Sequence, residues 1–314
     1  MKKKSRAPAW LRLRGLTAIA AALGMPPLFA HDFWIEPSIF SAQPGQRIEL
    51  RLRVGEHLAG DPVLLDAVRG RQFVMQDAVE RKPVAVRVAA DPAGSVTVSR
   101  PGLQVIGYFN QPARIELPAE KFNAYLKEEG LDSIIALRGQ RNQTDSSARE
   151  LYARCAKSLV LSGEPDESGD RRLGFPLELL AERNPYTLAA DQLLPVRLTF
   201  LDKPVEGALV MALSSLNPAE KLSARTDRDG RVQFQLRASG MWLIKAVHMI
   251  EVSEGIDADW ASYWASLTFA LPGESPAPAK PAANNTRASS DLVGSSVPRP
   301  ALRDARSPRR TPIS

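Results

Sequence analysis

Short segments that alternate apolar and polar residues are the feature that most constrains the fold of this chain of 314 residues. From Gln46 to Val54, the apolar residues Ile48, Leu50 and Leu52 alternate with polar ones. This period of two is typical of a β-strand with one buried face. Similar segments, separated by proline and glycine, follow at 71–75, 84–89, 95–99 and 103–109. Short strands at this spacing predict a first β-sandwich over residues 31–117.

A second group of strand-like segments follows residue 172. It comprises the segments 177–180, 194–200, 208–213, 222–226, 231–236 and 241–249. The turn from Thr226 to Gly230 has hairpin composition, because glycine tolerates positive φ. An aromatic segment from Trp260 to Phe269 closes the group. We predict a second sandwich over 173–270, so the fold class is mainly β, with two β-sandwich domains of the immunoglobulin-like or transthyretin-like kind.

Between these two groups the spacing of apolar residues becomes helical. Pro118 precedes the segment 119–129, in which Phe122, Tyr125 and Leu126 share one face. Two further helices are predicted, at 131–137 and 148–159. We therefore expect a helical insertion over 118–161, and a charged linker over 162–172.

Both ends of the chain differ in composition from its body. Basic residues precede a short apolar run from Leu16 to Met25, and two prolines interrupt the chain before Ala30. This pattern predicts an N-terminal signal peptide over 1–30 that is cut after Ala30, hence a periplasmic protein without a membrane-spanning segment after signal removal. Residues 271–314 are rich in proline, alanine, serine and arginine, which predicts a disordered tail.

The net charge of +6 arises from the two ends. The leader contributes +6 and the tail +4, which leaves −4 for residues 31–270. The body therefore lacks the basic character that nucleic-acid binding requires, and we expect no nucleic-acid partner. The single cysteine, Cys155, allows no internal disulfide, so a sizeable apolar core must stabilise the exported chain. Its apolar neighbours Leu151 and Leu159 predict a buried structural thiol.

Cleavage after Ala30 would make His31 the first residue, with a free α-amine beside its imidazole. The amine titrates near ~8 and the imidazole near ~6.5, so both readily become neutral nitrogen donors. Such donors suit copper, nickel or cobalt, and also zinc, while Asp32 or Glu56 can add oxygen. We predict a transition-metal site at His31, completed by the two other histidines of the chain, His57 and His248. A cut elsewhere would leave His31 an ordinary residue.

Each of the other two histidines also has a purely structural interpretation. His57 follows the strand at 46–54, and His248 shares one face of its strand with Trp242 and Ile244. At either place, a backbone carbonyl can bind the imidazole instead of a metal. The spacing of Trp260, Tyr263 and Trp264 likewise favours a core face over a surface that stacks on a sugar or partner.

Five motifs spread over the body carry a family resemblance. They are Ala30 to Trp34, Arg51 to His57, Pro118 to Phe122, Leu151 to Lys157 and Trp242 to Met249. In them the chain resembles a bacterial periplasmic family long left as a domain of unknown function, whose members are often labelled periplasmic components of cobalt or nickel uptake. The resemblance implies a protein that handles a transition metal and passes it to a separate membrane transporter. The second half is also similar to transthyretin-like or carboxypeptidase-regulatory-like sandwiches, a fold analogy that gives no function.

Two functional hypotheses from different classes follow. The first is a periplasmic accessory protein that binds nickel, cobalt or copper, which predicts that the three histidines converge. The second is a metal-free binding or adaptor module that grips a protein or glycan through its loops. An enzyme ranks third, because no nucleophile elbow, glycine-rich phosphate loop or zinc-protease motif is present in the sequence.

Overall fold

The computed structural model describes residues 31–272, except 67–70, 190–191 and 238. The predicted signal peptide and nearly all of the predicted tail lie outside the described residues. Within them the chain is mainly β, with several sheets and two α-helices. The predicted fold class is confirmed at that level.

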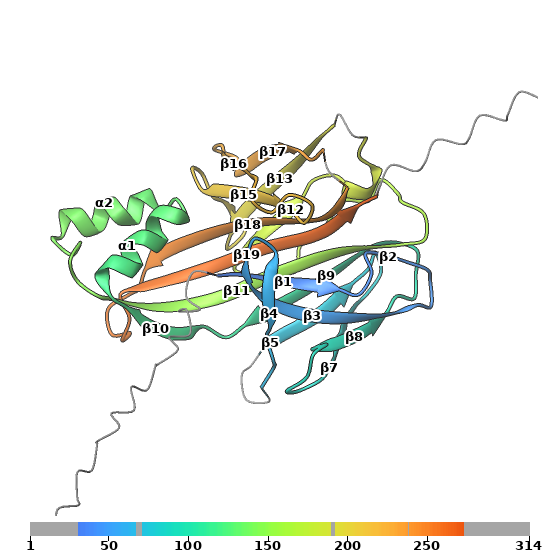
Figure 1. Cartoon of the computed structure of the whole chain (residues 1–314), viewed down its shortest axis with the longest axis horizontal. Helices are drawn as coiled ribbons and strands as arrows, with labels where there is room; N and C mark the ends of the chain where they lie inside the picture. The colour runs from blue at the N-terminus through green and yellow to red at the C-terminus, as the bar shows by residue number, and fades with distance from the viewer. Residues whose placement is uncertain (1–30, 67–70, 190–191, 238, 273–314) are drawn as a thin grey trace, which may run out of the picture. The chain divides into compact units, whose positions relative to one another are not determined.

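One long sheet joins strands from both halves of the described chain (Figure 1). Its strands, in spatial order, are β16 (Lys221–Arg225), β15 (Leu209–Ser214), β18 (Gly240–Glu251), β19 (Trp260–Leu271), β11 (Ala148–Ser162), β9 (Gly102–Asn110), β5 (Arg71–Gln76) and β6 (Arg81–Pro83). Two shorter strands, β10 (Ala113–Leu117) and β2 (Ser41–Ala42), also pair with β11. β11 runs parallel to β19 and antiparallel to β9, so it connects the earlier strands to the later ones.

A smaller sheet packs on the β5–β9–β11 part of the long sheet. It contains β1 (Asp32–Pro37), β3 (Arg47–Glu56), β4 (Ala59–Pro62), β7 (Ala85–Val86) and β8 (Gly94–Thr97). The alternation predicted for β3 is present, because Ile48, Leu50 and Leu52 are buried. They share one core with Met75 of β5 and Ile106 of β9. This core is that of a sandwich formed by two facing sheets.

The third sheet packs on the other part of the long sheet. It contains β12 (Leu177–Ala181), β13 (Leu193–Phe200), β14 (Lys203–Pro204) and β17 (Arg231–Gln235), and a 3-10 turn lies at Pro185–Thr187. Leu198 of β13 shares a core with Ile244 of β18 and with Leu267 and Phe269 of β19. Burying each large apolar side chain contributes about 1.5–3 kcal/mol. Such cores can stabilise a chain whose single cysteine leaves it without a disulfide.

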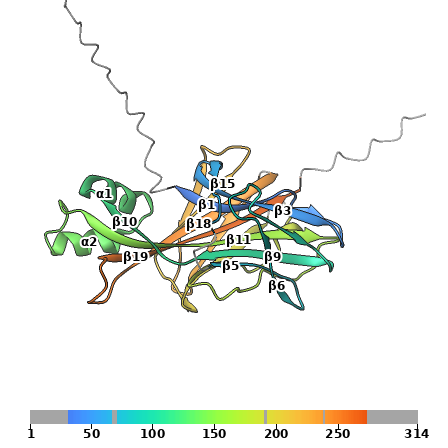
Figure 2. The same ribbon diagram turned by 90° about the horizontal axis from the view of Figure 1, so that it is seen from below.

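The two helices pack at one end of the long strands β11 and β19, beside β10 (Figures 1 and 2). They are α1 (Ala119–Glu128) and α2 (Asp132–Gln140). The predicted face of α1 is buried, and Phe122 and Leu126 share a cluster with Met249, Trp260 and Trp264. Trp260 and Trp264 are therefore core residues of a strand, which agrees with the core-face interpretation.

The third predicted helix, at 148–159, is wrong, because this segment is the strand β11. Strands on both sides and sheets packed on both faces bury nearly every side chain from Ala153 to Ser162. A strand buried on both faces has no alternation of apolar and polar residues. The spacing of Leu151, Cys155 and Leu159 therefore imitated a helical face.

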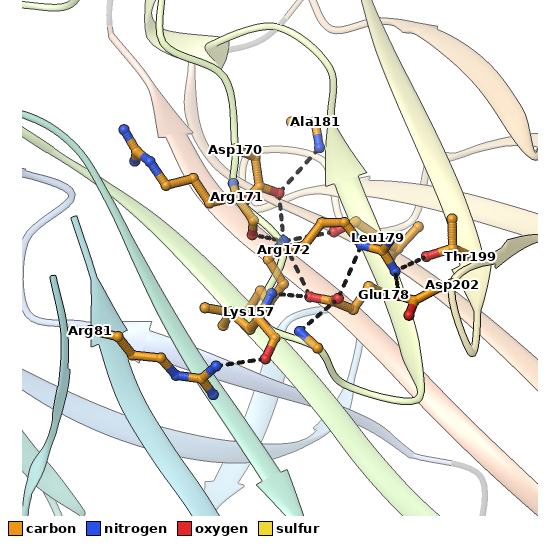
Figure 3. A network of polar contacts seen from close by, with 12 residues as sticks. Arg81, Lys157, Asp170, Arg171, Arg172, Glu178, Leu179, Ala181, Thr199 and Asp202 are labelled. Carbon is orange, nitrogen blue, oxygen red and sulfur yellow. Dashed lines mark hydrogen bonds and ion pairs between the residues drawn. The ribbon is translucent and has the colours of Figure 1, made fainter. Parts of the chain in front are cut away.

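The predicted linker 162–172 is tied to the core by a buried polar network (Figure 3). The Lys157 Nζ of β11 donates to Asp170 Oδ2 at 2.8 Å and to the carbonyl oxygen of Leu179 at 3.1 Å. Glu178 is also fully buried, and its carboxylate accepts the backbone N–H groups of Leu173 and Gly174. A buried charge needs such partners, so this network fixes the path of the linker.

Candidate functional site

The first described residue, His31, lies beside the hairpin formed by β3 and β4. Asp32 pairs with Gly55 in the antiparallel β1–β3 ladder, which places His31 near Glu56. The imidazole Nδ1 lies 3.3 Å from Glu56 Oε1, without the alignment of a hydrogen bond. This buried nitrogen has no hydrogen-bond partner in the described structure. Buried nitrogens without a partner are uncommon in folded proteins.

His57 lies in the turn of the same hairpin. His57 and Leu58 have φ values of 54° and 60°, the geometry of a tight two-residue turn between strands. The imidazole of His57 is exposed. A Cβ at Gly60 would lie 2.6 Å from the Trp34 ring, so the hairpin packs directly on β1. The hairpin thus places His57 close to the start of β1.

His248 has different surroundings, toward the C-terminal end of β18. Its ring lies 4.6 Å, centroid to centroid, from that of Phe200, and its cross-strand partner is Tyr263. Burial lowers the pKa of His248, so the neutral imidazole is favoured. Within the described residues, no three side chains of the histidine, cysteine, aspartate and glutamate types form a group that could hold a metal ion. The predicted chelate at His31 also includes an α-amine, which is not a side-chain donor.

The residue after His31 belongs to a buried ionic cluster. Lys245 Nζ lies 2.5 Å from Asp32 Oδ1 and 2.9 Å from Glu129 Oε1. Burial by itself lowers the pKa of Lys245, but the charges of Glu129 and Asp32 outweigh it and the pKa is raised. The pKa of Glu129 is also raised, by burial and by the charge of Asp32, because two carboxylates share one lysine. The cluster fixes the start of β1 between β18 and the end of α1.

A second buried cation, Arg154 of β11, lies beneath the same segment. Its Nη1 donates to the carbonyl oxygen of His31 at 3.1 Å, and its backbone N–H donates to Asn110 Oδ1 at 2.6 Å. The guanidinium lies over the ring of Trp264 at 4.7 Å and over those of Tyr152 and Phe33 at 5.4 and 5.9 Å. Burial lowers the pKa of this guanidinium. No carboxylate of the described residues lies within ion-pair distance of it, since none is within 4.0 Å.

Arg154 lines a cavity of about 240 Å³ between the long sheet and the smaller sheet that contains β1 and β3. The rings of Phe33, Tyr108, Tyr152 and Trp264 form part of its wall. Sequence reasoning placed Arg154 in a family motif but did not single it out. Arg154 is a weak sequence signal for such a site, because its strand also contains Arg149, Glu150 and Lys157. The four rings of the cavity wall come from four different strands.

One carboxyl group in the cavity wall, that of Glu150, is held by neighbouring hydroxyls. Tyr125 Oη donates to Glu150 Oε1 at 3.2 Å, and Ser262 Oγ donates to the same oxygen. Trp264 Nε1 donates to Ser262 Oγ at 3.0 Å and so orients the serine. Burial raises the pKa of Glu150, and these hydrogen bonds oppose the rise. The wall is therefore ordered by hydrogen bonds from three elements.

Cys155 is the neighbour of Arg154 on β11, and it faces the opposite core. The thiol is 1% exposed, and burial raises its pKa to about 12. The thiolate that metal binding and nucleophilic attack require is therefore scarce at neutral pH. The prediction of a buried structural thiol is confirmed.

Residues 28–250 match the sequence model of a family described as Domain of unknown function (DUF4198). This chain belongs to the DUF4198 family. A search of curated proteins found no match to it. Among solved structures, the D0-D1 domain of intimin is similar at 14% sequence identity, over 76% of this chain and 97% of that chain. The TM-score of 0.19 is too low for this likeness to support an argument about fold or function.

The DUF4198 match contains all three histidines, Lys245 and Arg154. It ends just before the last residue of β18, so Trp264, which forms part of the cavity wall, lies beyond it. None of the helices in the described ranges is long and apolar enough to cross a membrane.

Proposed function

We propose that this DUF4198 protein is a periplasmic carrier of nickel, cobalt or copper, and that its mature N-terminus provides the first metal donors. The observation that carries the proposal is the Nδ1 of His31, which is buried beside Glu56 and has no hydrogen-bond partner among the residues that the structure describes. The α-amine and Nδ1 of one terminal histidine can bind the same ion, and these nitrogen donors suit the metals named.

The neighbouring hairpin is the natural source of the remaining donors. Glu56 can supply a carboxylate oxygen at the position it already occupies, 3.3 Å from Nδ1. His57 lies one residue further on, in an exposed two-residue turn that a small rotation can redirect. The metal is cargo in this proposal, and a separate membrane transporter would receive it. Such a transfer needs donors that the transporter can reach, and Glu56 and His57 are exposed.

The resemblance to a family labelled as cobalt or nickel uptake components agrees with this proposal. We also propose that the second half is a transthyretin-like sandwich, a similarity that does not bear on the choice of ligand.

The experiment begins with the N-terminus of the exported protein, read by sequencing and intact mass. The same preparation is then titrated with Cu²⁺ and Ni²⁺ by calorimetry. We expect a chain that starts at His31 and binds one ion, and we expect His31→Ala to weaken binding by at least about tenfold, or 1.4 kcal/mol.

Two further variants locate the remaining donors. His57→Ala should weaken binding if the hairpin contributes a ligand. His248→Gln tests whether the histidine of β18 takes part. A mature terminus other than His31, or unchanged affinity in His31→Ala, would contradict the carrier function and favour a metal-free adaptor.

A further inference from the structure

The cavity at Arg154 combines an apolar wall with a cation that no carboxylate of the described residues neutralises at close range. Within the same part of the chain, its guanidinium donates to one acceptor, the carbonyl oxygen of His31. The residue is 8% exposed, so bulk water compensates its charge poorly. Asp32 and Glu150 act on it only from beyond ion-pair distance. A buried cation in this state is stabilised by an anion that reaches it.

The geometry of the group favours a carboxylate. A guanidinium presents a planar fork of N–H donors that a carboxylate can accept in pairs. Here the plane is held by rings of β1, β11 and β19, because the guanidinium carbon lies over Phe33, Tyr152 and Trp264. The contact to the carbonyl oxygen of His31 and the short hydrogen bond from its backbone to Asn110 keep Arg154 in place. The site is therefore built before any ligand arrives.

The acidic groups in the cavity wall limit the negative charge that a ligand can carry. Glu150 and Asp66 also line the cavity, and Asp66 has an interaction of its own. The two carboxyl groups near Arg154 disfavour a ligand with two negative charges, such as a phosphate monoester, because like charges repel strongly in a site of low dielectric. A ligand with one negative charge meets less of this repulsion, because Glu150 is held by two hydroxyl donors and Asp66 has a separate interaction.

The volume of the cavity limits the rest of the ligand. An apolar cavity of about 150 Å³ admits benzene, whereas pockets for drug-sized ligands span about 300–1,000 Å³. At about 240 Å³, this cavity suits one ring or a branched aliphatic group. The walls formed by Phe33, Tyr108 and Trp264 would contact such a body.

We propose that this cavity binds a small monocarboxylate with an aromatic or branched aliphatic body, and that Arg154 binds its carboxylate. The site is distinct from the proposed metal site, since it uses the side chain of Arg154 and the rings around it. It can be tested without metal, so its failure and that of the metal proposal are distinguishable.

The first test compares two probes of similar shape on the wild-type protein in the presence of EDTA. Benzoate carries the charge, and benzyl alcohol does not. Binding is followed by calorimetry and by the fluorescence of tryptophan, since Trp264 lies in the wall. We expect saturable binding of benzoate to one site, at least about tenfold tighter than that of benzyl alcohol, because hydrogen bonds to charged groups discriminate by this much. Equal affinities, or no saturable binding of benzoate, would overturn the proposal.

The second test uses variants with matched controls. Arg154→Met should abolish the preference for benzoate, whereas Arg138→Met should retain it. Arg138 is a suitable control because it is also buried and lies 4.9 Å from the centre of the Phe122 ring, outside the cavity wall. Equal losses in both variants would contradict a specific role for Arg154.

A surface variant keeps the test decisive should Arg154→Met fail to fold. Leu64 lies at the cavity and is 55% exposed, so Leu64→Glu adds a negative charge there without disturbing a core. We expect it to weaken benzoate binding several-fold by repulsion. Leu216→Glu, at a similarly exposed position outside the cavity, should leave binding unchanged. Unchanged binding in Leu64→Glu would count against the proposed site.

Discussion

Lys245 is a buried lysine whose charge two carboxylates share. Its contacts to Asp32 and Glu129 join the start of β1 to the end of α1 through β18, across more than a hundred residues of sequence. In the described part of the chain, Glu129 Oε2 has no hydrogen-bond partner, so this carboxylate relies on the contact of its other oxygen with Lys245. At the residue scale, the N-terminal segment therefore depends on one ammonium group.

Replacing Lys245 by methionine should destabilise the fold strongly. The variant leaves Asp32 and Glu129 buried without their counter-charge, and breaking a buried pair in this way costs about 3–5 kcal/mol. The free energy of unfolding, measured with urea at pH 7, checks this value. Lys221→Met is the control, because Lys221 and Glu128 form a surface pair at 4.0 Å, and such pairs contribute little. Similar small losses in both variants would contradict the role given to the cluster.

Asp77 gives a prediction about pH. Its carboxylate accepts the backbone N–H groups of Val79 and Glu80 and binds Arg100 at 2.9 Å. Burial raises the pKa of Asp77, but these hydrogen bonds together outweigh it and the pKa lies below its usual value. A carboxyl with a lowered pKa stabilises the fold above its unfolded-state pKa, and the stabilisation is lost as the pH falls through the folded-state pKa.

Asp77→Asn should therefore be less stable than the wild type at pH 7, by about 1 kcal/mol. The difference should shrink as the pH falls below the usual aspartate range, where the wild-type carboxyl is protonated too. Urea unfolding of both proteins over a range of pH measures the difference. A difference that stays constant with pH would show that the charge of Asp77 does not contribute.

At the scale of elements, β11 organises the fold. It pairs with β9 on one side and β19 on the other, and it carries Arg154 toward one core and Cys155 toward the other. Lys157 of the same strand binds the linker through Asp170 (Figure 3). Substitutions on this strand therefore affect both sandwiches.

The reactivity of Cys155 tests whether β11 is as inaccessible to solvent as its packing indicates. Because the thiol is buried and its pKa is raised to about 12, native protein should not react with a thiol reagent such as DTNB at pH 8. Unfolding in urea should release one reactive thiol per chain. Rapid reaction of the native protein would mean that β11 opens readily.

Elements with one buried face were predictable from sequence, and those without one were not. The alternation in β3 and the face formed by Phe122, Tyr125 and Leu126 in α1 match the structure, because each presents polar residues to solvent. β11 was taken for a helix because both of its faces are buried. The segment 162–172 was predicted only as a charged linker, yet Asp170 is buried against Lys157, a pairing that no local pattern indicates.

The candidate site was predictable only in part for the same reason. His31 stands out by its place after the predicted leader, and the strand register then brings Glu56 and His57 near it. The surroundings of Arg154 are made by β1, β9, β11 and β19, which are distant in sequence. Contacts between strands that are distant in sequence depend on the tertiary fold, and local sequence patterns do not reveal them.

At the scale of the whole molecule, the long sheet should make the two sandwiches unfold together. Its strands come from both halves, and all described residues fall in one compact unit. Urea unfolding should give one transition, coincident by tryptophan fluorescence and circular dichroism. A fragment of residues 173–270 should lack a cooperative transition, because β19 would lose its partner β11. Two separate transitions in the whole chain would contradict this account.

The proposed carrier function is tested most directly by comparing two chains that differ only in their first residues. One begins at His31, and the other begins at Pro26, so that its His31 has an amide in place of the α-amine and the proline at its second position lacks a backbone N–H. Copper is titrated into both, and the number of nitrogen donors is read from the electron paramagnetic resonance spectrum. We predict that the chain beginning at His31 binds copper at least about tenfold more tightly and shows more nitrogen donors. Equal affinity and equal spectra in the two chains would contradict a metal site built on the mature N-terminus.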